Sequence, residues 1–192
     1  MVDLCGQLSS DISADCTNKL FGGARDRLIL FNFDDVDGVT RNGVNTQIIE
    51  AISLASGTRG YVYQGKKNSN EPDSALVKQR YIDVYDHGVL FKAFEVDAAA
   101  KLEYEAMVDG LVIALVQNKF AGDDGDAEFE LYGLDTGLEV QELTRILADA
   151  DTQGAYNIAL RSSEQSKEAH LPATLYLTSQ TVTRAIVEAL IV

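Results

Sequence analysis

The chain alternates short runs rich in Tyr, Val and Phe with turn-forming residues between positions 59 and 96, and this pattern constrains the fold more than any other feature. Residues 59–63, 76–85 and 89–96 have the composition of β-strands. A polar stretch at 64–74 separates the first two and predicts a long loop, and Asp86, His87 and Gly88 predict a turn before the third. A long hairpin loop followed by a tight turn indicates consecutive antiparallel strands.

Further strand-like segments flank this central part. Residues 47–55 fit neither the strand nor the helix period cleanly, and we interpret them as a strand. Residues 128–132 alternate polar and apolar side chains, which is typical of a half-exposed strand. The remaining strands are expected at residues 27–33, 111–117, 138–147, 155–160 and 173–177, with turns at 34–38, 120–126 and 133–137.

Two segments predict helices. Asp97 is a suitable N-cap for residues 98–109, and Gly110 lies at the expected stop. The apolar stripe of this helix is expected to comprise Ala99, Leu102, Ala106 and Met107. The second helix is expected at 181–190 after Thr178 or Ser179, with one face formed by Val182, Ala185, Ile186, Ala189 and Leu190. The fold class predicted is mainly β, an antiparallel β-sandwich or barrel with one internal helix and a C-terminal helix.

Residues 1–24 have little apolar periodicity and predict an N-terminal arm, followed by a single β-rich domain at 25–192. Cys5 and Cys16 both fall in the arm, and we expect reduced thiols there rather than a disulfide or a zinc site. The sequence has no run of about eighteen apolar residues and no secretory signal pattern at its start, which predicts a protein without a membrane span, made in a cytosol-like compartment.

Acidic residues are concentrated in one part of the chain. Residues 97–151 contain 14 Asp and Glu against 3 Lys and Arg, so they carry 14 − 3 = 11 of the 14 net negative charges. A field of this sign repels polyanions and argues against binding of nucleic acid through a basic surface.

The side chains needed for catalysis or metal binding are few. His87 and His170 lie far apart in the sequence without a motif around either, which favours a packing or surface role and a protein that is not an enzyme. Residues 60–67 match the spacing of a phosphate-binding loop but end in Lys67 where Ser or Thr is needed. An EF-hand at 33–44 has Phe33 and Val44 at two ligand positions. We therefore expect no cofactor and no resident metal.

Several segments together carry a family resemblance: residues 68–72 (NSNEP), 81–87 (YIDVYDH), 132–138 (YGLDTGL), 151–156 (DTQGAY) and 167–172 (KEAHLP). Over about residues 27–190 the chain resembles virion structural proteins of tailed bacteriophages, including crAss-like and related phages, of the kind that form tail tubes or tail rings.

The resemblance implies a subunit of a homo-oligomeric ring, commonly six-fold, that assembles in the host cytoplasm and belongs to the tail of the virion. Its partners would be other copies of itself, other tail or connector proteins, and DNA that passes through the lumen without sequence-specific binding. Charges at the lumen or at an interface would be Glu128, Glu130, Glu139 and Glu142, which fit the solvated side of a sheet equally well. The 64–74 loop, with Gln64, Lys66, Lys67, Asn68, Asn70 and Glu71, and the N-terminal arm would bridge neighbouring rings, unless the loop is simply flexible.

An alternative function is a small-ligand or carbohydrate-binding β-sandwich. It would use strand tyrosines in a groove, with Tyr61, Tyr63, Tyr81 and Tyr85 as the candidates. A hydrolase with paired carboxylates has less support, because no two carboxylates can be placed within reach of each other from the sequence.

Overall fold

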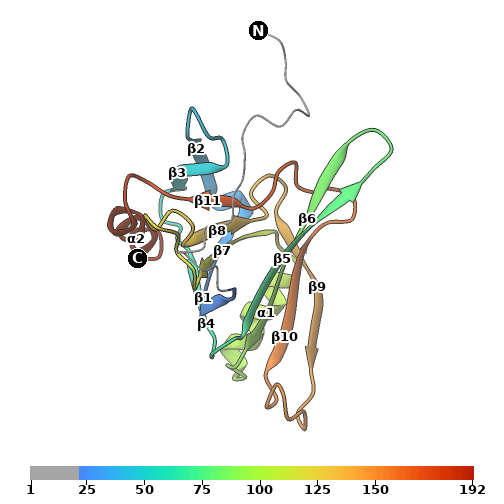
Figure 1. Ribbon diagram of the computed structural model, residues 1–192. Coiled ribbons are helices and arrows are strands. Elements are labelled where there is room, and N and C mark those ends of the chain that lie inside the picture. Colours follow the sequence, from blue (N-terminus) through green and yellow to red (C-terminus); the bar gives the residue numbers. More distant parts are fainter. Residues whose placement is uncertain (1–21) are drawn as a thin grey trace.

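The computed structural model describes residues 22–192, which form a mainly β fold with two α-helices (Figure 1). The strands are β1 (Ala24–Asn32), β2 (Val36–Arg41), β3 (Ile48–Leu54), β4 (Tyr61–Gln64), β5 (Asn70–Lys78), β6 (Asp83–Ala93), β7 (Val112–Asn118), β8 (Phe129–Tyr132), β9 (Leu138–Arg145), β10 (Tyr156–Ser162) and β11 (Ala173–Leu175). The helices are α1 (Ala98–Val108), α2 (Gln180–Ala189) and a 3-10 turn, η1 (Phe33–Asp35).

Strands β1, β7 and β8 lie at the centre and are buried on both faces. Along β1, Leu28 and Leu30 pack into one hydrophobic cluster with side chains of β6, β10 and α1. Ile29 and Phe31, which alternate with them, pack into a second cluster with β3, β11 and α2. The predicted sandwich-like arrangement with an internal and a C-terminal helix is therefore confirmed. One strand pair is parallel, β3 with β11, so the sheet is mixed rather than wholly antiparallel.

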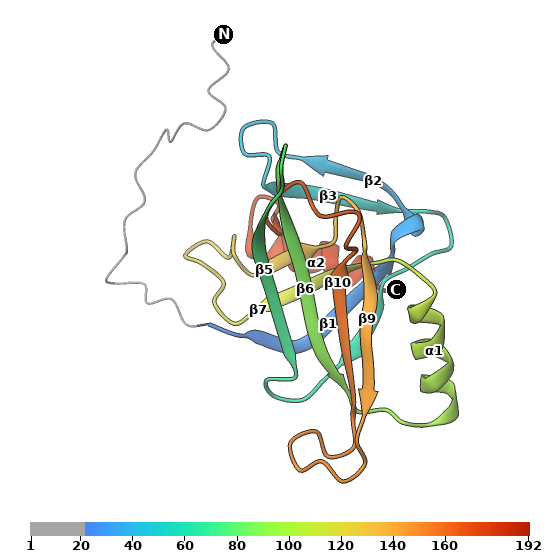
Figure 2. The same ribbon diagram turned by 90° about the vertical axis from the view of Figure 1, so that its right-hand side faces the viewer.

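Strands β5, β6, β10 and β9 form a long antiparallel sheet in that order. In Figure 2 this sheet lies in front of the central strands, with its outer face toward the viewer. At one edge β5 pairs with β6 alone, and at the other β9 pairs with β10 and with β7 only at Leu138. Along most of their length both edges therefore lack a backbone partner among the described residues, although α1 contacts β9 and β1 contacts the start of β5.

The predicted loop at 64–74 is wrong in its second half. The connection covers residues 65–69, and Asn70 begins β5, which pairs with β6 over its whole length. Pro72 lies inside this strand opposite Val89. Because β5 is an edge strand, the missing N–H of the proline costs no ladder hydrogen bond on the open side, and a polar, proline-containing sequence can still form a strand.

The predicted turn at Asp86, His87 and Gly88 is also wrong, because these residues lie within β6 and the chain reverses at residues 79–82. A Cβ atom on Gly88 would lie 2.5 Å from Asp73 Oδ1 and 2.9 Å from Arg161 Nη1. The glycine leaves room for the Arg161 side chain to cross the sheet, so its role is close approach and not chain reversal.

Both helices form where the sequence predicts them, but the residues that each helix buries differ from the predicted apolar face. The Asp97 carboxylate caps α1 by accepting a hydrogen bond from Ala100 N at 2.8 Å, as expected. The buried side of α1 is formed by Tyr104 and Met107, whereas Leu102, placed in the predicted stripe, is 66% exposed. In α2 the buried residues are Thr183 and Val187 rather than Val182, Ala185 and Ala189.

The strand predicted at 76–85 is wrong, because these residues contain the end of β5, the chain reversal and the start of β6. Strand β2 was not predicted, since its first residues fall in the turn expected at 34–38. The remaining strand predictions are confirmed to within a few residues, including the ambiguous segment that forms β3. Of the predicted N-terminal arm, residues 1–21 with Cys5 and Cys16 lie outside the described residues. No helix between residues 22 and 192 has both the length and the apolar character that crossing a membrane requires.

Candidate interaction surfaces

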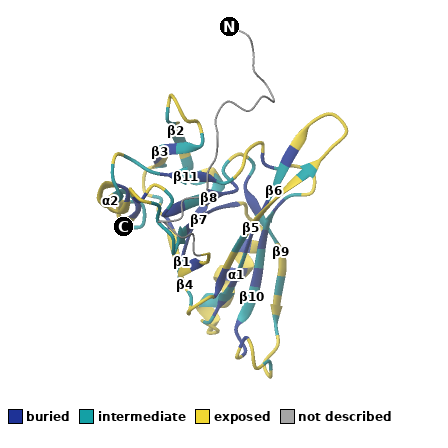
Figure 3. Ribbon diagram, viewed as in Figure 1, coloured by how far each residue is buried: buried dark blue, intermediate teal, exposed yellow. Residues whose placement is uncertain are grey.

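The outer face of the β5-β6-β10-β9 sheet is rich in carboxylates. Alternation along the strands and the pairing register place Glu71, Asp73 and Asp86 on this face. Glu139 lies on the same face opposite Arg161, and Glu142 lies opposite Ala159. The basic residues on this face are Lys92 and Arg161. Figure 3 shows that exposed and half-buried residues predominate on the edge strands of this sheet.

Arg161 and Lys167 bind part of the acidic set, whereas Lys92 forms no salt bridge within residues 22–192. Arg161 binds Asp86 at 3.1 Å and Asp73 at 3.2 Å, and Lys167 binds Asp86 at 2.8 Å. Within residues 22–192, Glu71, Glu139 and Glu142 form no salt bridge. The face therefore retains uncompensated negative charge along both edge strands.

A register shift in the β9–β10 pair brings Glu139 and Glu142 to the same side. These residues are three apart and would face opposite sides of a regular strand. The register changes between Ala159 and Leu160, with Gln141 as the extra residue of β9, so both carboxylates point away from the core. Their predicted role as lumen or interface charges stays a prediction.

Glu128, in contrast, is wrongly predicted as a lumen or interface charge. Its side chain is 1% exposed and accepts hydrogen bonds from Arg184 Nε and Nη2 at 2.8–3.0 Å and from Gln117 Nε2 at 2.6 Å. These bonds connect the start of β8 to α2, and the Glu128 carboxylate raises the pKa of Arg184. Glu130 is half-buried and accepts a hydrogen bond from the Tyr132 hydroxyl at 2.9 Å.

The predicted inter-subunit residues near the 65–69 connection are mostly held by their own chain. Asn70 is buried and donates to Arg25 O at 2.8 Å, and Asn68 Oδ1 accepts from Lys119 Nζ at 2.7 Å. Lys66 Nζ lies 4.4 Å from the centre of the Phe94 ring.

Gln64 Nε2 donates to Asp26 O at 3.4 Å. Lys67 and Glu71 are exposed. A contact of these residues with another subunit stays a prediction.

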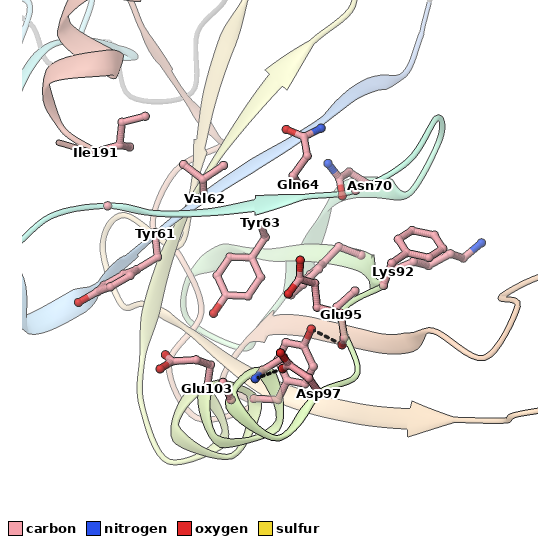
Figure 4. Close-up of a pocket in the computed structure, with 18 of the residues that line it drawn as sticks. Tyr61, Val62, Tyr63, Gln64, Asn70, Lys92, Glu95, Asp97, Glu103 and Ile191 are labelled. Atoms are coloured by element: carbon pink, nitrogen blue, oxygen red, sulfur yellow. Dashed lines mark hydrogen bonds between the residues drawn. The ribbon is translucent and has the colours of Figure 1, made fainter.

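A pocket of about 600 Å³ lies between β4, the end of β6 and the first half of α1 (Figure 4). Tyr61 and Tyr63 line it from β4, and Glu103 and Tyr104 line it from α1. The Tyr63 hydroxyl points toward α1. Burial, reinforced by the nearby Glu103 carboxylate, raises the pKa of Tyr63 to about 12, so this hydroxyl is a neutral donor at physiological pH.

Tyr104 fixes the floor of the pocket. Its hydroxyl donates to Glu95 O at 3.0 Å, which ties α1 to the segment that follows β6. Glu95 and Asp97 add two further carboxylates to the lining. Sequence analysis missed the contribution of α1, because nothing in the local pattern places residues 103 and 104 beside β4.

The tyrosine groove of the alternative function is only half formed. Tyr61 and Tyr63 share the pocket, whereas Tyr81 lies at the far tip of the β5–β6 hairpin and is 84% exposed. Tyr85 lies near that tip and pairs with Glu168. The four tyrosines therefore do not form one groove.

A buried polar network surrounds His87, which the sequence did not predict. The imidazole Nδ1 accepts from Gly133 N at 3.2 Å and Nε2 donates to His170 O at 3.0 Å. Because a backbone N–H can only donate and a carbonyl can only accept, these contacts fix the neutral tautomer protonated at Nε2. Burial lowers the pKa of His87. Both ring nitrogens are hydrogen-bonded within the protein, so neither is free to act as a general base, and the residue has a structural role.

Glu168 completes this network. It is buried, and its carboxylate accepts from Asp135 N at 2.8 Å, from Thr136 N at 3.0 Å and from the Thr136 hydroxyl at 2.7 Å. It thereby holds the turn between β8 and β9.

Between residues 22 and 192 no group of three or more His, Cys, Asp or Glu side chains is arranged to hold a metal ion.

Comparison with known proteins found no matching family model, no matching curated protein and no matching solved structure.

Proposed function

We propose that this protein is a virion structural protein, a subunit of a homo-oligomeric tail tube or tail ring of a bacteriophage, through which DNA passes. The observation that carries the proposal is the β5-β6-β10-β9 sheet, which combines two open edges with an acidic outer face. The sequence resemblance to tailed-phage tail proteins supports the same assignment.

The two open edges provide a route to assembly. An open strand offers unpaired N–H and C=O groups to another strand. Edge β5 of one copy and edge β9 of the next are different surfaces, so their contact is head to tail. Repetition of such a contact closes into a ring when the rotation between copies permits it. A ring joined in this way has one sheet face directed inward.

The charge of the outer face is suited to a channel for DNA. The face carries Glu71, Glu139 and Glu142 without salt bridges to residues 22–192, and its Arg161 is already bound to Asp73 and Asp86. Phosphate groups bind where Lys and Arg are free to replace counterions, and this face has few. Directed toward a lumen, it would let DNA move without holding it.

Mass measurement by light scattering together with negative-stain electron microscopy tests the proposal. Over a series of concentrations of the full-length chain, we expect multimers of uniform mass and rings or tubes with a central hole. A protein that remains monomeric throughout the series contradicts the proposal.

A small-ligand-binding protein is the second candidate, and the pocket lined by Tyr61, Tyr63 and Tyr104 is the observation that favours it. Aromatic walls beside a few polar groups are typical of sites for sugars and other small molecules. A monomer whose melting temperature rises on addition of a saccharide, with the rise abolished by Tyr63→Ala, would favour this function over the first.

A further inference from the structure

The tip of the β5–β6 hairpin exposes an aromatic and apolar surface. Gln79 N donates to Ile82 O at 3.1 Å, so Arg80 and Tyr81 occupy the two turn positions. Tyr81 is 84% exposed, Ile82 61% and Leu76 51%. The guanidinium carbon of Arg80 lies 5.2 Å from the centre of the Tyr81 ring. In Figure 1 this hairpin projects from the body of the molecule, so its tip is free to enter a second molecule.

The pocket beside α1 has the complementary chemistry. Tyr61 and Tyr63 provide aromatic walls, and Glu95, Asp97 and Glu103 provide carboxylates. Among residues 22–192, the side chains of Glu95 and Glu103 form no salt bridge. The basic lining residues are Arg59, whose guanidinium carbon lies 5.8 Å from the Tyr61 ring centre, and Lys92, which points away from Tyr63 and Glu103 (Figure 4). A guanidinium entering between Tyr63 and Glu103 would gain an ion pair and a cation–π contact.

The tip and the pocket lie at opposite ends of the same hairpin. The β5–β6 pairing runs from Asn70 opposite Phe91, at the pocket, to Lys78 opposite Asp83, at the tip. At roughly 3.3 Å per residue the two are about 26 Å apart, so a tip cannot reach the pocket of its own chain. A second copy can present its tip, and the resulting contact runs along the strands, across the direction of the edge-to-edge contact proposed above.

We propose that the Arg80–Tyr81–Ile82 tip of one copy docks in the pocket of a second copy, with the Arg80 guanidinium at Glu103 and the Tyr81 ring against Tyr61 and Tyr63. This inference rests on the proposed function, since it names the contact that joins one ring to the next. Each copy carries both the tip and the docking pocket, so the contact repeats head to tail and stacks rings into a tube.

A charge exchange tests the docking in the full-length protein. Arg80→Glu and Glu103→Arg each place like charges together and should raise the concentration at which rings stack by about tenfold or more. The double variant R80E/E103R restores opposite charges and should stack at nearly the wild-type concentration. The matched control R80E/E105R introduces the same charges, but Glu105 is exposed on α1 and does not line the pocket, so it should not restore stacking. Sedimentation velocity and the lengths of particles in negative stain provide the measurement.

The outcomes separate this inference from the proposed function. Wild-type rings whose stacking is unchanged in R80E and E103R overturn the docking and leave the ring assignment intact. Restoration by R80E/E105R as complete as that by R80E/E103R also overturns it, because the effect would then come from net charge. A wild-type protein that stays monomeric at every concentration overturns both. Because Arg80 and Glu103 are exposed, melting curves of all variants should match the wild type and exclude misfolding.

Discussion

Glu128, which pairs with Arg184, is the least exposed carboxylate in any salt bridge of the described chain. The carboxylate is 1% exposed, while half of the Arg184 side chain remains in contact with solvent. The arginine is the main partner of a charge that water does not reach, and Gln117 supplies the remaining bond. Removal of the arginine would leave a buried carboxylate with a single hydrogen bond, which is costly, whereas loss of an exposed pair costs little.

Arg184→Met should therefore lower the free energy of unfolding by about 3 kcal/mol, because a buried carboxylate loses its cationic partner. Arg27→Met is the matched control. Arg27 of β1 pairs with Glu188, which lies on α2 as Arg184 does, but the Glu188 side chain is 58% exposed. We expect its cost to stay below about 1 kcal/mol. Urea denaturation followed by circular dichroism measures both. Equal losses in the two variants would show that burial of the Glu128 carboxylate does not increase the cost of removing its partner.

His87 makes stability depend on pH. In the unfolded chain a histidine takes up a proton below about pH 6.5, whereas burial lowers the pKa of folded His87 despite the opposing carboxylates of Glu168, Asp135 and Asp86. Acidification therefore favours the unfolded chain. Stability should be greatest above about pH 6.5 and should fall below it, by at most about 1.4 kcal/mol per pH unit for one proton.

Urea denaturation at a series of pH values between 7.5 and 5 measures this effect. His87→Gln should be less stable than the wild type at pH 7.5 but should show a flatter decline. An unchanged slope in His87→Gln would assign the decline to other groups.

Helix α1 is the element that closes the pocket, and its first turn depends on one cap. Asp97→Ala removes the carboxylate that accepts from Ala100 N and should cost about 1 kcal/mol. The loss should appear locally as faster hydrogen exchange in the first turns of α1. Ser179→Ala is the comparison in α2, where the cap bond to Val182 N is longer, at 3.4 Å, and a smaller loss is expected. A larger effect from Ser179 than from Asp97 would contradict this ranking.

The local sequence pattern predicts the positions of most helices and strands, but it predicts poorly which of their side chains are buried. The Asp97 side chain caps the start of α1, so the position of the helix could be found from the sequence. The helix ends before Gly110, as predicted, but Gly110 does not adopt a positive φ there. The burial of Glu128 could not, because it depends on Arg184, which is 56 residues away. Gly88 was misinterpreted as a turn residue for the same reason, since its role depends on Arg161 crossing β6. The pocket likewise requires β4 and α1 to come together, which no local pattern encodes.

At the scale of the whole molecule, the two proposed contacts run in different directions. Edges β5 and β9 lie on either side of the sheet, and the hairpin tip and the pocket lie at its two ends. One contact would join copies around a ring and the other would join rings along an axis. The acidic face belongs to neither contact and would stay open to the lumen.

Reversal of the charge on that face should convert a surface that repels DNA into one that binds it. Glu139→Lys with Glu142→Lys leaves the core untouched, because both side chains point outward from β9. We expect assembly to persist, and we expect the assembled variant to retain duplex DNA with an affinity that falls steeply as salt increases, since new lysines release phosphate counterions. Fluorescence anisotropy of a labelled duplex at several salt concentrations measures the retention. Glu105→Lys with Asp109→Lys makes the same change in net charge at two exposed positions, one on α1 and one just after it. Equal DNA retention by this control would mean that overall charge, and not the β9 face, determines the passage of DNA.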